Sequence, residues 1–407
     1  MTGVQTCALP ISPTTSIKTQ EGRFARLEAI EWWDQELLGR SHVLVIGAGA
    51  LGNEVVKNLA LLGVGHVVVV DMDSVETSNL SRSVLFREGD EGRAKAVCAA
   101  VAARGIYPRM EVTPLVGNVL ADVGLGYFRW ADVVIGALDN REARVFVNGA
   151  CARVGKAWFD GGIEVLHGVV RGFSAPRTAC YECTMSQVDW ELLNKRRSCS
   201  LLARRAAVER GTPTTPTTAS VIGAMQVAEA VKYLHGLPSL LGKGFVFDGA
   251  EHSSYSVTYP TSPDCPWHEE AAAVESCGDF GSDTPLSTVW KAGAERLGGL
   301  DWIEFARELV EKVECPACGH ASAILQAAEA IEADRLRCPR CGKECAPVFF
   351  HAISAGSELL ESTPRRVGLP AWDIVWARRG SAYIGFELAG DDPWRGNNGA
   401  SNSRKGE

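Results

Sequence analysis

Short apolar runs alternate with helix-like segments over the first two thirds of the chain. The runs end at the glycines after Ile46, at Asp71 and at Asp139. Continuous apolar runs of this length are typical of buried parallel strands. The alternation predicts an α/β fold with a doubly wound, Rossmann-like, mostly parallel sheet, whose carboxyl strand ends bind ligands. Further strands are expected at 165–175 and 244–259, and helices at 23–38, 50–62, 92–104 and 219–235.

The pattern weakens between residues 184 and 218. This segment lacks clear periodicity and ends in a Thr/Pro-rich stretch. A long irregular segment inside a compact domain is usually functional or mobile. We therefore interpret 184–218 as a crossover loop within a first domain that spans residues 20–270.

The composition changes again after about residue 270. Acidic and small residues at 269–284 resemble a linker, and a smaller second domain is expected at 285–390. Its predicted parts are a helix at 298–312, a paired-cysteine module at 315–345 and a strand-rich end at 347–388. At the termini, residues 1–19 are expected to be artefactual or disordered, because 2–11 resemble a translated sequencing adapter, and 391–407 are expected to be a disordered tail.

Composition and charge argue against two classes of partner. The chain is 46% hydrophobic and 22% charged, and its net charge of −8 disfavours a broad nucleic-acid surface. No apolar run approaches the ~20 residues that a membrane helix needs, and the first residues lack the pattern of a signal peptide. We expect a cytoplasmic protein that binds neither nucleic acid nor membrane.

A glycine turn and an acidic residue follow the first two predicted strands. Gly47, Gly49 and Gly52 permit a tight turn and close backbone approach to phosphate at a helix N-terminus. Asp71 follows at the spacing expected for a residue that binds a ribose hydroxyl. Alone, these features also fit a nicotinamide dehydrogenase or a Rossmann domain that binds nucleotide without chemistry.

A further polar series extends this site. Arginine and lysine can neutralise phosphate oxygens, and a carboxylate at a strand end suits Mg²⁺. The series therefore favours a site for ATP and Mg²⁺, and adenylation rather than hydride transfer. Its members are Asp73, Asn79, Arg82, Lys95, Asp139 and Asn140.

Two segments carry a family resemblance. They read Gly47-Ala-Gly-Ala-Leu-Gly-Asn-Glu-Val-Val-Lys-Asn-Leu-Ala and Asp71-Met-Asp-Ser-Val-Glu-Thr-Ser-Asn-Leu-Ser-Arg. They resemble the ubiquitin-activating-enzyme superfamily, which includes the ThiF-type adenylyltransferases for sulfur-carrier proteins. The resemblance covers roughly residues 20–270, and the phrasing is more similar to the branch that activates ubiquitin-like proteins.

The resemblance implies roles for single residues. Asp71 is expected to bind ribose and Asp139 to bind Mg²⁺, while the phosphates are expected to contact Asn79, Arg82 and Lys95. Arg26 matches an arginine that reaches the triphosphate of the other subunit in the family's dimers, which implies a homodimer. Ser83 departs from the family, which usually has glutamine after this arginine.

The cysteines favour metal binding over disulfides. Three C-x-x-C pairs occur, and Cys265 with His268 forms a fourth close pair, so two four-ligand zinc sites are expected. We expect both sites to be structural, and the second to be a zinc ribbon. Cys98 and Cys151 are expected in the core. The ligands are Cys180, Cys183, Cys265 and His268 in one site, and Cys315, Cys318, Cys338 and Cys341 in the other.

Cys199 differs because it is unpaired and follows Lys195-Arg196-Arg197-Ser198. Nearby cations lower a thiol pKa and favour the nucleophilic thiolate. In the family, a cysteine of the crossover loop takes the activated acyl group. The alternative is an inert surface thiol.

We therefore predict an activating enzyme that adenylates the C-terminal glycine of a ubiquitin-like protein and captures it as a thioester on Cys199. The resemblance further implies a conjugating enzyme as partner, in a bacterial system that often serves antiviral defence. Adenylation of a sulfur-carrier protein, with a persulfide on the same thiol, is the alternative within enzymes. A non-catalytic nucleotide-binding scaffold is the alternative outside them.

Overall fold

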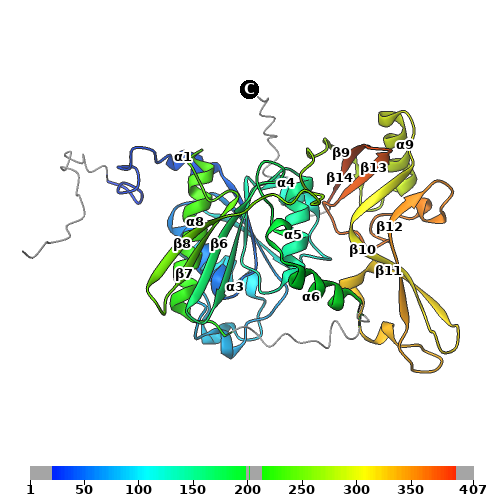
Figure 1. Ribbon diagram of the computed structural model, residues 1–407, viewed down its shortest axis with the longest axis horizontal. Coiled ribbons are helices and arrows are strands. Elements are labelled where there is room, and N and C mark those ends of the chain that lie inside the picture. The colour runs from blue at the N-terminus through cyan, green and yellow to red at the C-terminus, as the bar shows by residue number, and fades with distance from the viewer. Residues whose placement is uncertain (1–20, 199–200, 202–212, 391–407) are drawn as a thin grey trace, which may run out of the picture.

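The computed structural model describes residues 21–198, 201 and 213–390 (Figure 1). Within these residues, the first sheet has eight strands in the order β3-β2-β1-β4-β5-β6-β7-β8. The strands from β3 to β5 are parallel, and β6 to β8 continue antiparallel. Their bounds are β1 His42–Ile46, β2 His66–Asp71, β3 Glu111–Val116, β4 Val133–Gly136, β5 Trp158–Glu164, β6 His167–Phe173, β7 Lys243–Asp248 and β8 Ser253–Thr258.

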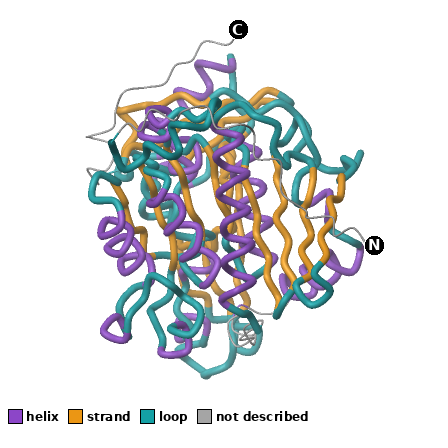
Figure 2. Tube along the Cα trace, turned by 90° about the vertical axis from the view of Figure 1, so that its left-hand side faces the viewer, coloured by secondary structure: helices purple, strands orange, loops and turns teal. Residues whose placement is uncertain are grey.

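Helices cover both faces of the first sheet. Val43 and Val45 of β1 belong to one hydrophobic core, under α2, α3 and α8, while Leu44 and Ile46 belong to the opposite core, under α4 and α5. Successive strand residues point to opposite faces, so a continuous apolar run fits a strand buried on both sides. Figure 2 shows helices lying along the strands. The bounds are α2 Ala50–Leu61, α3 Lys95–Ile106, α4 Leu125–Trp130, α5 Arg141–Arg153 and α8 Pro216–Leu234. The predicted doubly wound α/β sheet is confirmed.

A second sheet lies beside α4 and α5 (Figure 1). Its strands follow the order β11-β10-β13-β14-β9, and β12 also pairs with β10. It has its own apolar core with α9 Leu286–Leu297, and Trp376 packs into the core shared with the first sheet. Its strands are β9 Val274–Gly281, β10 Trp302–Glu314, β11 Ala321–Ala327, β12 Ala346–Ser354, β13 Ile374–Arg379 and β14 Ala382–Ala389.

Short helices complete the described chain. The α-helices are α1 Gln35–Arg40 and α6 Gln187–Ser198, and the 3-10 helices are η1 Thr77–Asn79, η2 Glu88–Asp90, η3 Glu182–Thr184, η4 Ala328–Ala330, η5 Asp334–Leu336 and η6 Glu358–Glu361. No helix of the described residues has the length and apolar character to cross a bilayer.

Four predicted elements are wrong. Residues 23–32 form successive turns, and only α1 follows, capped by Asp34. The expected linker at 269–284 contains β9, which pairs in parallel with β14. The expected helix at 298–312 is strand β10, and the non-periodic segment contains α6. The division of the chain into domains stays a prediction, and residues 1–19 and 391–407, for which disorder or an artefact is predicted, fall outside the described residues.

Candidate active site

The turn between β1 and α2 uses its three glycines differently. Gly47 has φ +98°, and a Cβ on it would lie 2.3 Å from the Ala137 carbonyl oxygen. A Cβ on Gly52 would lie 1.9 Å from the Gly47 carbonyl oxygen, so the fold itself requires both glycines. Around Gly49 no protein atom lies within 4 Å of an added Cβ. Gly49 therefore leaves open space before the N-terminus of α2, where a phosphate would be stabilised.

Asp71 is fixed at the end of β2. Its carboxylate accepts hydrogen bonds from the Ala48 N–H at 2.6 Å and the Asp73 N–H at 2.8 Å. Burial raises the pKa of Asp71 above its usual value, and these hydrogen bonds oppose that shift. Lys95 opens α3, and its Nζ lies 2.8 Å from Asp73 Oδ2. The structure thus brings the acidic pair and Lys95 together beside the glycine turn.

Asn79 and Arg82 lie on the loop after β2. Asn79 is buried in η1, where its side chain accepts the Glu76 N–H at 3.0 Å, a capping contact that supports the loop. Arg82 donates to the Ser78 carbonyl at 2.6 Å and borders the adjoining cleft. Ser83, where the resemblance expects glutamine, is buried.

Asp139 and Asn140 follow β4. Asn140 caps α5 through its Oδ1, which accepts the Ala143 N–H at 2.8 Å, and its Nδ2 donates to Asp139 Oδ1 at 3.1 Å. Asp139 is exposed, and its other oxygen has no hydrogen bond within the described chain. An exposed carboxylate at a strand end fits Mg²⁺, so Asp139 would hold the ion beside the phosphates.

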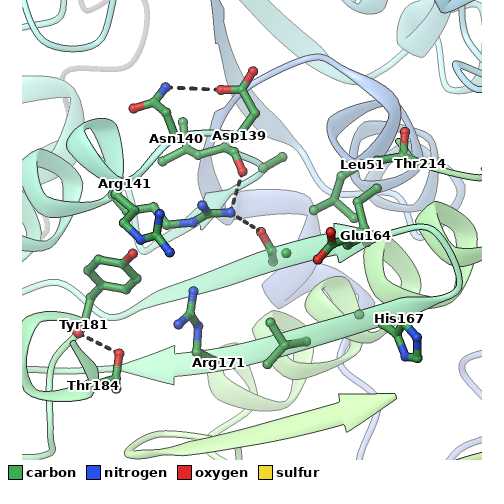
Figure 3. Close-up of a pocket in the computed structure, with 18 of the residues that line it drawn as sticks. Leu51, Asp139, Asn140, Arg141, Glu164, His167, Arg171, Tyr181, Thr184 and Thr214 are labelled. Atoms are coloured by element: carbon green, nitrogen blue, oxygen red, sulfur yellow. Dashed lines mark hydrogen bonds between the residues drawn. The ribbon is translucent and has the colours of Figure 1, made fainter. Parts of the chain in front are cut away.

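A cleft of about 990 Å³ opens at the carboxyl ends of β4 and β5 and runs along β6 (Figure 3). Arg82 and Asp139 line it together with Ala50 and Leu51, the first residues of α2 after the glycine turn. Glu164 and His167, at the tip of the β5–β6 hairpin, also line it, and α6 contributes Leu193. The cleft connects the predicted nucleotide position with the surface.

The segment that carries Arg26 lies away from this cleft. Arg23 donates to the carbonyl of Ile106, the last residue of α3, and Phe24 packs against Tyr107 with ring centroids 5.6 Å apart. Lys95 is the first residue of α3, which has 12 residues and is about 18 Å long. Within one chain, this segment therefore lies near the far end of α3. Cys199, the predicted nucleophile, lies outside the described residues.

The first cysteine cluster joins the loop after β6 to the segment after β8. Cys180 Sγ lies 3.4 Å from Cys265 Sγ, and Cys183 Sγ lies 3.0 Å from His268 Nε2. All four ligand atoms lie within 4.8 Å of one another, which fits tetrahedral zinc. Burial raises the pKa of Cys183, but hydrogen bonds, the largest from the Ser262 N–H, lower it to about 7.

The second cluster lies at one end of the three-stranded ribbon β10–β11–β12. The Cys315–Cys341 and Cys318–Cys338 sulfur pairs are each 3.5 Å apart, close to the ~3.8 Å that tetrahedral Zn–S bonds of about 2.3 Å impose. After each C-x-x-C pair the chain turns at a glycine with φ near +70°, at Gly319 and Gly342. These residues also fit zinc. Cys98 and Cys151 are buried on α3 and α5, as expected.

The sequence pattern of the ThiF family matches residues 22–267, more than half of the chain. The chain belongs to the ThiF family. The crystal structure of E. coli MccB with ATP shares the fold of this ThiF-family protein, with a TM-score of 0.51 and 22% identity over 62% of this chain and 75% of that one.

Curated relatives of this ThiF-family protein are activating enzymes and adenylyltransferases by name. SAMP-activating enzyme E1 of Haloferax volcanii is 32% identical over 65% of this chain and 92% of its own length. Sulfur carrier protein adenylyltransferase of Thermus thermophilus is 34% identical over 57% and 83%. Human ubiquitin-like modifier-activating enzyme 7 is 40% identical over 37% of this chain, but only 16% of its own length. These names support ATP-dependent adenylyltransferase activity.

Sequence reasoning missed a charged group in the cleft of this ThiF-family protein. Asp160 on β5 is fully buried and binds Arg144 of α5 and Arg171 of β6. Tyr181 lies against Arg171, its ring centroid 4.9 Å from the guanidinium carbon. The available signal was a carboxylate directly after the apolar run that ends at Phe159, because a buried acid requires a cationic partner.

Proposed function

We propose that this protein activates a ubiquitin-like protein by adenylating its C-terminal glycine with ATP and Mg²⁺. The observation that carries the proposal is the arrangement of Asp71, Lys95 and Asp139 around one end of the sheet, beside a cleft that leads to the surface. The relatives support the coarser class, an ATP-dependent adenylyltransferase.

The first step needs positioning more than acid–base chemistry. A carboxylate oxygen of the tail attacks the α-phosphorus of ATP, and the bond from that phosphorus to the bridging β-phosphate oxygen breaks. The products are an acyl-adenylate and pyrophosphate. The nucleophile is already ionised, so no general base is required. Asp71 holds the ribose, and Arg82 and Lys95 neutralise phosphate charge that grows on the leaving group.

The Lys95 side chain is already held in place for its proposed role of neutralising phosphate charge. It is only 12% exposed and rests on Asp73, whose side chain is 56% exposed. Phosphate oxygens can compete for the ammonium with little movement, because Lys95 lies near Asp71, whose carboxylate binds the Ala48 N–H in the glycine turn. Bound Mg²⁺ at Asp139 would offset further phosphate charge. Arg26 would complete the site from the second subunit of a homodimer.

The second proposed step forms a thioester. The thiolate of Cys199 attacks the acyl carbon of the adenylate, and AMP leaves with the electrons of the broken C–O bond. The acyl group then passes to the thiol of a conjugating enzyme. The alternative is activation of a sulfur-carrier protein, favoured by the relative from Thermus thermophilus that this chain covers to 83%.

Partner-dependent ATP–pyrophosphate exchange tests the proposal. We expect exchange that requires a C-terminal glycine on the partner and is lost in Lys95→Ala and Asp139→Ala. Cys199→Ala should retain exchange but lose a thiol-sensitive covalent adduct. Exchange that survives Asp139→Ala would refute its metal role, and a chain that binds ATP without any exchange would be a scaffold.

A further inference from the structure

The floor of the cleft carries an unbalanced charge. Asp160 is fully buried, and its single carboxylate binds two guanidinium groups, Arg144 through Oδ1 at 2.9 Å and Arg171 through Oδ2 at 3.1 Å. The side chains of the two arginines are only 12% and 18% exposed. One carboxylate compensates one of these cations, so one positive charge remains in a largely dehydrated place. Such a charge is costly unless an anion joins it.

The charged side chains around Asp160, Arg144 and Arg171 do not neutralise this excess positive charge. Arg141 at the start of α5 is already paired with Asp189 of α6 at 3.0 Å. Burial raises the pKa of Tyr181, so its phenol stays neutral. Glu164 lies at the hairpin tip, four residues along β5 from Asp160, and Glu142 lies beside Arg141 on α5. Both border the cleft without an ion pair to Arg171.

The two arginines differ in what they can still bind. Arg144 also donates to the carbonyl oxygens of Leu138 and Gly161, which fixes it as part of the wall. Arg171 donates hydrogen bonds from its Nε and one terminal nitrogen to Asp160. Its other terminal nitrogen has no hydrogen-bond partner within the described residues. Figure 3 shows Arg171 rising from β6 toward Tyr181 and the cleft.

We propose that Arg171 is a specificity position that binds an acidic side chain of the substrate's C-terminal tail. A guanidinium held on one edge by Asp160 presents its other edge in a fixed orientation, which suits a carboxylate. The proposal rests on the proposed function, because it assigns the cleft to the tail.

The register of the sheet determines which residue of the tail Arg171 can contact. Gly136 at the end of β4, Asp160 on β5 and Arg171 on β6 are direct neighbours across three strands. Two strand spacings amount to about 10 Å, which an extended peptide covers in about three residues. With the terminal carboxylate placed at the end of β4, next to Asp139 and the proposed phosphate position, Arg171 contacts an acidic residue about three positions earlier in the tail. A nucleotide phosphate offers similar chemistry, and the experiment distinguishes it.

Binding of labelled peptides to the full chain tests this without requiring catalysis. The probes are eight-residue peptides that end in Gly-Gly and carry Glu, Gln or Lys at the third, fourth or fifth position from the end. Fluorescence anisotropy without ATP should show the Glu peptide binding about tenfold or more tightly than the Gln peptide at one of these positions, with the Lys peptide weakest. Equal binding of Glu and Gln peptides by the wild-type protein would overturn the proposal.

Variants assign the effect to the residue. Arg171→Gln should remove the preference for Glu, and Arg171→Lys, which keeps a charge beside Asp160, should keep part of it. Arg177→Gln, an exposed arginine outside the cleft lining, is the matched control and should behave as wild type. A preference that persists in Arg171→Gln would refute the assignment.

Calorimetric titration with ATP separates the two sources of an anion. Unchanged ATP affinity in Arg171→Gln supports the tail, and a loss of ATP affinity that matches the lost peptide preference would assign Arg171 to the nucleotide and overturn the proposal. Absence of peptide-dependent pyrophosphate exchange would count against adenylation, while the anisotropy result would still decide the role of Arg171.

Discussion

Gly49 and Gly52 lie three residues apart in one turn, but we expect the fold to require Gly52 and nucleotide binding to require Gly49. We expect Gly49→Ala to change the free energy of unfolding by about 1 kcal/mol or less, because φ is −71° and no protein atom opposes the new methyl group. The methyl group would fill the space proposed for phosphate, so ATP affinity should fall about tenfold or more. Chemical denaturation and calorimetric ATP titration measure the two effects.

Gly52→Ala is the matched comparison. Its Cβ would meet the Gly47 carbonyl at 1.9 Å, so we expect a loss of about 3 kcal/mol of stability. If Gly49→Ala bound ATP as wild type does, the phosphate position before α2 would be wrong.

His66 predicts a pH dependence of stability at the opposite ends of the same strands. Its ring stacks on His42 at 4.7 Å, and burial together with the neighbouring His42 lowers the pKa of His66 below its ordinary 6.5. The native state then binds fewer protons than the unfolded chain. Its stabilising contribution is present above pH 6.5 and is lost as pH falls through the folded-state pKa.

His66→Gln should therefore lose less stability than wild type between about pH 7.5 and pH 5.5. Denaturation curves at both pH values measure this, with His351→Gln on an exposed position of β12 as control. An identical decline in wild type and His66→Gln would show that His66 does not titrate as argued.

At residue scale, the sequence predicted which polar side chains lie at the same edge of the sheet. It did not predict the hydrogen bonds and ion pairs that fix their positions. Asp71 and Asp139 lie at or just after strand ends, and Lys95 opens the helix between β2 and β3, so the topology of a parallel sheet brings all three to one edge. The hydrogen bonds of Asn79 to its own loop and the pairing of Lys95 with Asp73 depend on loop conformation. The Asp160 group joins residues from β5, β6 and α5, which no local pattern links.

Among the elements, the two cysteine clusters lead to a metal count. We expect two zinc ions per chain by elemental analysis, because each cluster offers four converging ligands. Cys183→Ser and Cys318→Ser should each lower the count to about one. A wild-type count near one would exclude one cluster, and the variant that leaves the count unchanged would identify it.

The ribbon core includes one residue from the segment after α6. Leu201 is 3% exposed and packs with Val310, Val313, Ile331 and Leu336. Leu201→Ala should destabilise the ribbon by about 2–4 kcal/mol and speed zinc transfer to a chelator. Leu192→Ala on α6, where the side chain is 50% exposed, is the control and should leave zinc release unchanged. Equal release from both variants would show that Leu201 does not support the ribbon.

The misassigned elements share a physical cause. In β10, Ile303, Phe305 and Leu309 alternate as a strand requires, but a charged residue, Arg307, occupies the inward position between them, and a bulge at 310–312 shifts the register. β9 consists mostly of polar and small residues, and its partner β14 lies about a hundred residues later in the sequence. Local composition cannot reveal a strand that exists because of a distant partner.

On the scale of the whole molecule, the second sheet is attached by a buried ion pair. Arg307 of β10 and Asp373 are almost fully buried and lie 2.9 Å apart. Arg307 also donates to the carbonyl oxygens of Leu120, Ala121 and Val123, and Asp373 accepts the Leu125 N–H at 3.1 Å. The Arg307 side chain thus provides hydrogen bonds to three backbone carbonyl groups of the loop before α4, a helix that covers the first sheet.

Arg307→Leu should destabilise the protein by about 3–5 kcal/mol, because it leaves Asp373 buried without its cation and three carbonyls without a donor. Chemical denaturation followed by tryptophan fluorescence measures the loss, and we expect the second sheet to unfold in a separate, earlier transition. Arg378→Leu is the control: its partner Glu304 keeps Arg153 at 3.2 Å. The double variant Arg307→Leu/Asp373→Leu should recover part of the loss, since no unpaired charge remains. A double variant as unstable as the sum of the two single variants would show that the attachment depends on packing rather than on this ion pair.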